Sequence, residues 1–123
     1  MIWGSRRTTF EDLSTEAALD ALIQASMSEP IVLFKHSQMC GASYRAQREM
    51  EEYGREASPR VNRLVVQRAR ALSERIEDLF GIRHQTPQVI VLFGGVSVFD
   101  TSHRGVTAEA VRAAISSVQR HND

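Results

Sequence analysis

Two short stretches of the chain, residues 31–34 and 89–93, are unbroken runs of apolar residues. A strand with one face in water alternates apolar and polar residues, whereas a strand covered on both faces reads as a continuous apolar run. Neither run approaches the roughly 20 residues that a membrane-spanning helix requires. The chain is therefore expected to fold around a central sheet with helices on both of its faces, which is an α/β architecture.

Four other segments have apolar residues three or four positions apart, which is the spacing of one helix face. The first begins at Ser14 or Thr15 and the last at Thr107, residue types that cap helices. Gly54 and Pro59 are expected to end the second helix, and Gly81 the third. The apolar positions are Leu19, Leu22 and Ile23; Ala46, Met50 and Tyr53; Leu72, Ile76, Leu79 and Phe80; and Val111, Ala114, Ile115 and Val118.

The remaining signals complete the order of elements. Residues 61–66 predict another strand, Pro87 opens the run at 89–93, and Gly94-Gly95 is a hairpin signal before a strand at 96–99. The order is helix, strand, helix, strand, helix, strand, strand, helix. It predicts a mixed four-stranded sheet that contains a parallel pair and an antiparallel hairpin. We expect one domain over residues 1–123, with a frayed tail at 121–123.

Composition argues against several classes of partner. The formal net charge is zero, so no overall field attracts nucleic acid or a membrane surface. Arg60, Arg63, Arg68 and Arg70 have acidic neighbours, which favours a solvated face over a basic patch. Residues 1–13 lack the apolar core of a secretory signal, and one cysteine cannot build a disulfide framework. The cytoplasm is therefore the expected compartment.

Cys40 is the only cysteine, and it lies where the first buried strand is expected to lead into a helix. Free backbone N–H groups and the positive end of the helix dipole stabilise a thiolate at such a place. A free cysteine is often a small buried hydrophobe, but Gln38-Met39 before it and Gly41-Ala42 after it are typical of a surface turn. Because the chain has no second thiol, any disulfide must join Cys40 to another molecule.

The order of elements, with a cysteine at the first strand-to-helix junction and Thr86-Pro87 before the third strand, resembles the thioredoxin fold over nearly the whole chain. Cys40-Gly41-Ala42-Ser43 is similar to the Cys-Gly-Pro-Cys site of thioredoxins, with serine replacing the second cysteine. The resemblance implies a cis peptide bond at Pro87, facing the thiol. Met39 replaces a tryptophan and Phe34 a buried acid, so the proton acceptor of a dithiol cycle is missing.

Further motifs resemble the monothiol bacilliredoxins, a family of bacterial general-stress proteins. The matching segments are Val32-Leu33-Phe34-Lys35-His36-Ser37, Cys40 with Ser43, Phe80-Gly81-Ile82, His84-Gln85-Thr86-Pro87-Gln88-Val89, Ser102-His103 and Val106-Thr107. Gly41-Ala42 stands where the family usually has Pro-Ile, and Arg104 where it often has an aromatic residue. The resemblance implies a cytoplasmic monothiol oxidoreductase that removes a low-molecular-weight thiol of the bacillithiol type from protein mixed disulfides.

The resemblance also implies roles for individual residues. Cys40 is the expected nucleophile, and Ser43 can donate a hydrogen bond to its sulfur. Lys35 and Arg45, by their charge, are expected to favour negative sulfur and an acidic thiol. The other substrate-binding candidates are Met39, Gly41, Thr86, Pro87 and His103, with Thr86 pairing to the substrate backbone like an added strand. The expected partners are S-thiolated client proteins and the small thiol as co-substrate, without bound cofactor or metal, for a monomer or weak dimer.

Two other functions stay open. Cys40-Gly41-Ala42-Ser43 also resembles the Cys-Gly-Phe-Ser site of monothiol glutaredoxins, which share an iron–sulfur cluster between subunits, although residues 100–103 lack the Gly-Gly-Asp segment of that group. The other is a non-catalytic thioredoxin-like interaction domain. A zinc site is not expected, because His36 and Cys40 are too few ligands for a structural site. His36 and His103 are expected to be hydrogen-bonded or solvated rather than catalytic.

Overall fold

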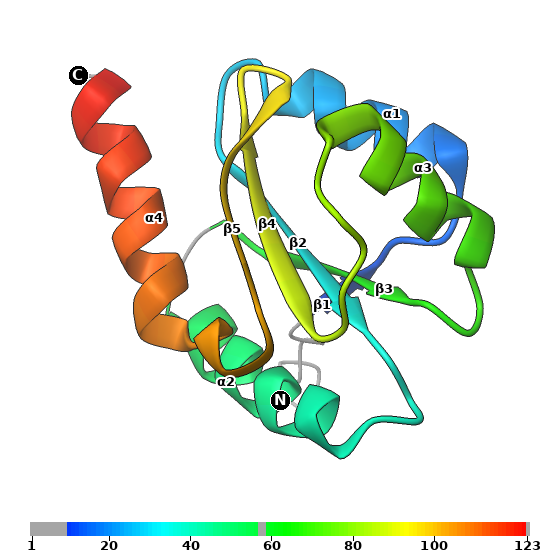
Figure 1. Cartoon of the computed structure of the whole chain (residues 1–123). Coiled ribbons are helices and arrows are strands. Elements are labelled where there is room, and N and C mark those ends of the chain that lie inside the picture. Colours follow the sequence, from blue (N-terminus) through cyan, green and yellow to red (C-terminus); the bar gives the residue numbers. More distant parts are fainter. Residues whose placement is uncertain (1–9, 57–58, 123) are drawn as a thin grey trace, which may run out of the picture.

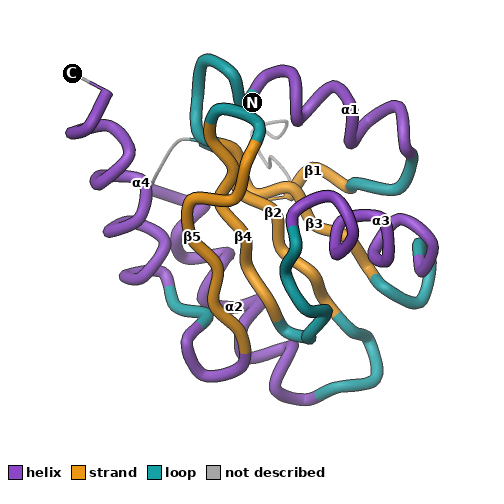
Figure 2. The backbone as a smooth tube through the Cα atoms, turned by 45° about the horizontal axis from the view of Figure 1, so that its top comes forward, coloured by secondary structure: helices purple, strands orange, loops and turns teal. Residues whose placement is uncertain are grey.

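The computed structural model describes residues 10–56 and 59–122. In chain order the elements are β1 (Phe10–Asp12), α1 (Glu16–Ala25), β2 (Ile31–His36), α2 (Gly41–Glu56), β3 (Val61–Val65), α3 (Arg70–Phe80), β4 (Gln88–Phe93), β5 (Val96–Ser102), the short 3₁₀ helix η2 (His103–Gly105) and α4 (Ala108–Asn122). The strands form one sheet in the order β1-β3-β2-β4-β5 (Figure 1; Figure 2). The predicted parallel pair is β2 with β3, and the predicted antiparallel hairpin is β4 with β5.

The two apolar runs of the sequence are the central strands β2 and β4, which are buried on both faces as predicted. Figure 1 shows α1 and α3 on one side of the sheet and α2 and α4 on the other. Val32 and Phe34 belong to the core beneath α2 and α4, whereas Ile31 and Leu33 belong to the core beneath α1 and α3. Successive residues of β2 therefore serve two separate hydrophobic cores.

The sheet has five strands where the sequence predicted four. The additional strand, β1, pairs in parallel with β3, and Phe10 lies opposite Val61. Phe10 packs against Phe34 with ring centroids 6.0 Å apart, while Glu11 and Asp12 are exposed. One apolar residue followed by two acidic ones gives no alternation long enough to indicate a strand. The sequence pattern therefore did not predict β1.

Helix ends and the hairpin follow their sequence signals. Thr15 caps α1 by accepting the N–H of Ala18 at 3.1 Å. Gly81 ends α3 in the left-handed conformation, with φ 68°. Gly94 and Gly95 have φ 68° and 80°, which suits the tight turn of a two-residue hairpin.

Two helices run past a position that was expected to end them. Helix α2 continues through Gly54 and ends at Glu56, before Pro59, and α4 extends to Asn122. Asp123 lies outside the described residues. Within the described part of the chain, no helix combines the length and apolar character that crossing a membrane requires.

Candidate active site

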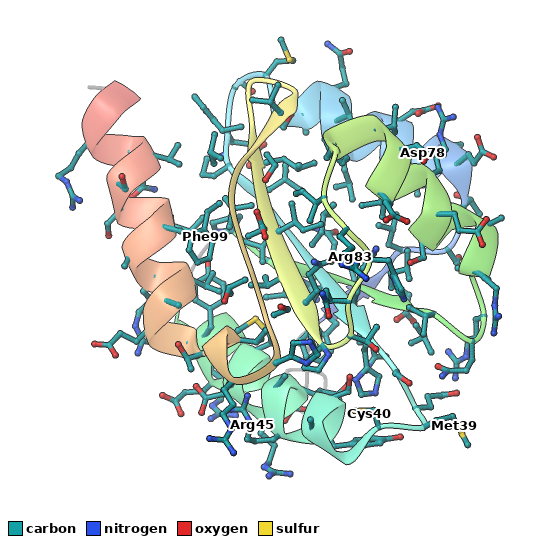
Figure 3. The ribbon with its side chains drawn as sticks, in the orientation of Figure 1. Met39, Cys40, Arg45, Asp78, Arg83 and Phe99 are labelled. Atoms are coloured by element: carbon teal, nitrogen blue, oxygen red, sulfur yellow. The ribbon has the colours of Figure 1, made fainter. Side chains whose placement is uncertain are left out.

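Cys40 lies at the N-terminus of α2, where the sequence placed it. Its carbonyl oxygen accepts the N–H of Ser43 at 3.1 Å, so it occupies the cap position, and its side chain is partly exposed (Figure 3). The first turn of α2 has no acidic residue. The N–H groups of Gly41 and Ala42 have no hydrogen-bond acceptor among the described residues. Free N–H groups and the positive end of the helix dipole make the start of a helix a favourable place for an anion.

The neighbours of Cys40 leave the thiol open to approach. Met39 is 85% exposed and lies on the outer side of the loop (Figure 3). A side chain built at Gly41 would meet no atom within 4 Å. A bulky disulfide therefore has space on both sides of the sulfur along the chain.

Ser43 is buried and holds the loop that leads to Cys40. Its Oγ accepts the N–H of Ser37 at 3.1 Å. The Oγ of Ser37 in turn accepts the N–H of Met39 at 3.2 Å and an N–H of the Gln67 amide at 2.9 Å. Among the described residues, no hydrogen bond joins Ser43 to the Cys40 sulfur, so the predicted donation to sulfur is not found. Ser43 instead fixes the shape of the turn.

The prolyl loop, residues 81–87, leads into β4 at the end of the sheet where β2 leads into the Cys40 loop. Its Thr86–Pro87 bond is cis, as the resemblance implied. Gln88 lies opposite Lys35 in the β2–β4 ladder, so Pro87 comes where β2 ends and the Cys40 loop begins. The backbone N–H and C=O of Thr86 have no hydrogen bond within the described residues. They are free to pair with an extended segment of a substrate.

His103 connects the prolyl loop to α2. Its N–H donates to the Pro87 carbonyl at 2.9 Å, its Nε2 lies 2.7 Å from Gln85 Oε1, and its carbonyl accepts from Arg45 Nη2 at 3.0 Å. Its φ of 56° is left-handed, a conformation that a non-glycine residue keeps where its surroundings hold it. Arg45, Pro87 and His103 thus come together at the end of the sheet that carries Cys40.

Lys35 is a correction to the sequence analysis. It follows Ile31 and Leu33 on the α3 side of β2, and it is 1% exposed. Its Nζ lies 3.1 Å from Nδ1 of His84. The prediction that Lys35 contacts substrate is wrong for this geometry, because the alternation of the strand turns its side chain away from α2 and into the protein.

His36 is also more deeply placed than expected. It is 2% exposed, and its Nδ1 has no hydrogen-bond partner within the described residues. Its ring meets Tyr44 edge-on, with centroids 4.9 Å apart. Burial lowers the pKa of His36, the charge of Arg63 lowers it further, and a backbone hydrogen bond with Ser43 opposes both. A neutral imidazole therefore packs under the first turn of α2. The sequence does contain a signal for this burial, because His36 follows Val32 and Phe34 at the two-residue spacing of one strand face.

Gln67 is a site residue that no sequence pattern indicated. Its amide accepts the N–H of Gln38 at 3.0 Å and donates to the Oγ of Ser37, 30 positions earlier. These contacts exist only because β2 and β3 pair, which brings the ends of both strands together. The sequence could not predict these contacts, because a glutamine in a turn does not indicate which distant residue it will bind.

Comparison with known proteins gives a family and a fold. The sequence model of a family described as monothiol bacilliredoxin BrxC matches residues 11–111. The structure is similar to a presumed oxidoreductase with a thioredoxin fold, with TM-score 0.80, 23% identity, and coverage of 86% of this chain and 93% of that one. It is similar to thioredoxin from Trypanosoma brucei brucei, with TM-score 0.75, 12% identity, and coverage of 98% and 99%. It is also similar to thioredoxin f from spinach chloroplast, with TM-score 0.71, 18% identity, and coverage of 90% and 94%. These structural likenesses establish the predicted thioredoxin fold.

Proposed function

Because the chain belongs to the monothiol bacilliredoxin BrxC family, we propose that it reduces mixed disulfides between client proteins and a low-molecular-weight thiol of the bacillithiol type. Cys40 is the reacting thiol. The observation that carries the proposal is its position: a partly exposed cysteine caps α2, and the place of a second thiol is taken by the buried residue Ser43. Such a site can form a disulfide with another molecule but cannot close one within itself.

The reaction consists of two thiol–disulfide exchanges. In the first, the Cys40 thiolate attacks the sulfur of the small thiol, a new S–S bond forms, and the client cysteine leaves as a thiolate that takes a proton from solvent. In the second, the thiolate of another small thiol attacks the small-thiol sulfur now bound to Cys40. Cys40 leaves as a thiolate, and the two small thiols depart as their disulfide. Each step breaks one S–S bond and forms one.

The N-terminus of α2 supports both steps. The nucleophilicity of a thiolate falls as its stability rises, so a helix N-terminus that stabilises a thiolate helps it little as an attacker. As a leaving group, the same thiolate departs faster. The larger benefit therefore falls on the second step, in which Cys40 passes on the thiol that it has captured.

Substrate contacts follow from the groups around the sulfur. Backbone groups of Thr86 pair with the client segment beside its cysteine, and Met39 and Gly41 give it space. Arg45 donates one N–H group to the His103 carbonyl. A guanidinium has five N–H donors, so Arg45 keeps others for the acidic groups of the small thiol.

The test uses the reduced 123-residue chain and a client protein that carries bacillithiol on one cysteine. Mass spectrometry should show that the client loses one bacillithiol and that the protein gains the same mass at Cys40. Cys40→Ser is the matched control, because serine is a preferred helix cap and keeps the start of α2. Capture that is no faster with the wild-type chain than with this control would refute the proposal.

The other two functions give different outcomes. An iron–sulfur carrier would acquire visible absorbance after anaerobic reconstitution, and Cys40→Ser would abolish it. A non-catalytic interaction domain would have a Cys40 thiol that is inert to iodoacetamide at neutral pH. Either result without thiol capture would count against reductase activity.

A further inference from the structure

A polar cluster on the α3 side of the sheet reaches from the buried Lys35 and Ser73 to the exposed His84. Nζ of Lys35 lies 3.1 Å from Nδ1 of His84, and Oγ of Ser73 lies 3.0 Å from the same nitrogen. Lys35 and Ser73 are both buried. The preceding residues on this face of β2, Ile31 and Leu33, belong to the apolar core. Lysine therefore stands at a core position where an aliphatic side chain would continue the pattern.

Burial of Lys35 has a free-energy cost, because its ammonium group loses water. Burial lowers the pKa of Lys35 from 10.5 to about 8, and the carboxylate of Glu77 opposes this shift. An apolar residue would avoid the cost, so the core does not require a lysine here. What the lysine adds is its contact with His84.

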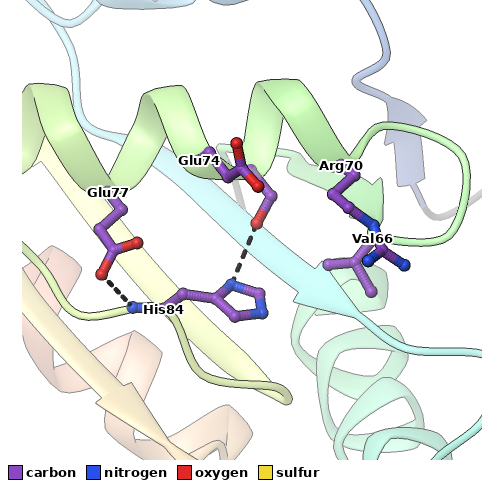
Figure 4. A pocket seen from close by; sticks show the side chains of 6 residues that line it. Val66, Arg70, Glu74, Glu77 and His84 are labelled. Carbon is purple, nitrogen blue, oxygen red and sulfur yellow. Dashed lines mark hydrogen bonds between the residues drawn. The ribbon is translucent and has the colours of Figure 1, made fainter.

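That contact fixes the state of the His84 ring. A protonated Lys35 can only donate, so Nδ1 of His84 accepts, and the neutral ring carries its proton on Nε2. Nδ1 also meets Oγ of Ser73 at 3.0 Å, and Figure 4 draws this contact as a dashed line from the His84 ring, whose other nitrogen points away from it. Burial is the main reason that the pKa of His84 is lowered. The charged groups that also act on it are Lys35 and Arg70, which lower it, and Glu77 and Glu74, which raise it.

Hydrogen bonds rather than packing hold this ring. His84 is an exposed residue, and it borders a cavity of about 320 Å³ (Figure 4). The cavity is lined by Val66, Arg70, Ser73, Glu74, Glu77 and His84. Since open space lies beside the imidazole, the place of the ring depends on Lys35 and Ser73, while the backbone N–H of His84 donates to Oε2 of Glu77 at 3.1 Å (Figure 4).

His84 belongs to the prolyl loop, three residues before Pro87. Beside it, the carbonyl of Arg83 accepts a hydrogen bond from the Gln88 amide at 3.0 Å. Gln88 lies directly opposite Lys35 in the β2–β4 ladder. The loop is thus fastened to the sheet on the α3 side, and a displacement of His84 is passed along the backbone to Pro87.

We propose that Lys35 is a positioning residue of the thiol site, which fixes His84 and, through it, the prolyl loop that a mixed disulfide meets beside Cys40. This inference rests on the proposed function, in which the backbone of Thr86, next to Pro87, contacts the substrate. Lys35 touches no reacting atom. Its effect falls on the orientation of a bound mixed disulfide and leaves the reactivity of Cys40 toward a small reagent unchanged.

The central variant is Lys35→Met. We expect kcat/KM for the bacillithiol–client mixed disulfide to fall by about 10-fold or more, since small displacements in a site have effects of this size. The rate of Cys40 alkylation by iodoacetamide should stay the same, and Tm should stay the same or rise. Leu33→Met, on the same strand and face, is the matched control and should keep kcat/KM within about 2-fold, because this swap nearly conserves volume.

Two further measurements separate positioning from general packing. His84→Ala should lower kcat/KM as Lys35→Met does, and the double variant should be no worse than either, because both act through one contact. The ratio of wild-type to Lys35→Met rates should shrink as pH rises through about 8, where Lys35 loses its proton and becomes a weaker donor. Dividing each rate by the rate of Cys40 alkylation at the same pH removes the effect of pH on the thiol itself.

Equal kcat/KM for the wild type and Lys35→Met, with a ratio that does not change with pH, would overturn the inference and leave the proposed function intact. If Lys35→Met does not fold, an unchanged kcat/KM in His84→Ala overturns it in the same way. A folded wild type whose Cys40 is alkylated but captures no bacillithiol would instead refute the proposed function, and this inference with it.

Discussion

At Ser43, a buried hydroxyl oxygen accepts the N–H of Ser37 and so holds the turn that presents Cys40. Sulfur is a weak acceptor, so a second cysteine at this position would hold the turn less firmly. The serine of the motif is therefore more than the absence of a resolving thiol. It is a structural support of the nucleophile next to it.

Ser43→Ala removes this acceptor and leaves the Ser37 N–H buried without a partner. We expect the free energy of unfolding, measured by urea denaturation, to fall by about 1–3 kcal/mol. Ser116→Ala, at an exposed position of α4, is the control and should change it by no more than about 0.5 kcal/mol. Equal effects of the two substitutions would show that the Ser43 hydroxyl does not stabilise the turn.

Tyr53 is a buried residue whose hydroxyl has no hydrogen-bond partner within the described residues. Burial raises the pKa of Tyr53 from 10.0 to about 12, and Arg112 opposes the shift. The folded state therefore keeps the phenol protonated more strongly than the unfolded state does. Its contribution is complete below pH 10 and is lost as pH rises from 10 toward 12.

Tyr53→Phe should therefore lose less stability than the wild type between pH 10 and about 12, as chemical denaturation at several pH values can measure. At neutral pH its free energy of unfolding should be within about 1 kcal/mol of the wild type, because an unpaired hydroxyl is removed. Tyr44→Phe, at an exposed tyrosine, should keep the alkaline loss of the wild type. Parallel curves for wild type and Tyr53→Phe would contradict the assignment.

At the scale of elements, the start of α4 is capped from two sources. Thr107 Oγ1 accepts the N–H of Ala110 at 3.1 Å, and Glu49 Oε1 of α2 accepts the N–H of Ala108 at 2.9 Å. The first cap is local and was predicted from the sequence. The second joins residues 59 positions apart, and only the packing of α2 against α4 brings them together.

Substitution of Glu49 should show what the second cap contributes. Glu49→Gln keeps an acceptor oxygen but removes the negative charge at the helix N-terminus, and it should cost about 0.3–1 kcal/mol of unfolding free energy. Glu49→Ala also removes the acceptor and should cost about 1–2 kcal/mol in the same urea denaturation. Glu52→Ala, at an exposed position of α2, is the control. No difference between Glu49→Ala and Glu52→Ala would exclude a capping role.

At the scale of the whole molecule, the features predicted from sequence are those with local causes. Apolar runs gave the central strands, and helical spacing gave the four long helices. The thiol's place at a helix start also follows from neighbouring residues. The pairing of Lys35 with His84 was not predictable, because 49 positions separate them and a lysine ordinarily indicates a surface. Strand β1 was not predicted for a related reason: its own residues carry no strand pattern, and only its pairing with β3 makes it a strand.

At the end of the molecule opposite the thiol, hydrogen bonds join the end of α1 to the hairpin turn between β4 and β5. Ser26, which follows α1, accepts the N–H of Gly94 on its carbonyl at 2.6 Å and the N–H of Gly95 on its Oγ at 3.0 Å. Pro87 and Gly94 stand at opposite ends of β4 (Figure 1). The hairpin turn is therefore remote from the site.

Ser26→Ala should lower the free energy of unfolding by about 1–3 kcal/mol, because it leaves the Gly95 N–H without its acceptor. The rate of Cys40 alkylation should not change, since the disturbance lies at the far end of the sheet. Ser28→Ala, at an exposed serine, is the control for stability. A slower alkylation in Ser26→Ala at equal folded population would show that the two ends are coupled.

Lys35 is the only lysine of the chain, and it is buried. A dye that acylates primary amines should therefore leave Lys35 unlabelled while the protein stays folded. The dye can reach Lys35 only when β2 separates from α3. The fraction of molecules labelled at Lys35, read by mass, thus reports how many molecules have opened, without engineering any residue.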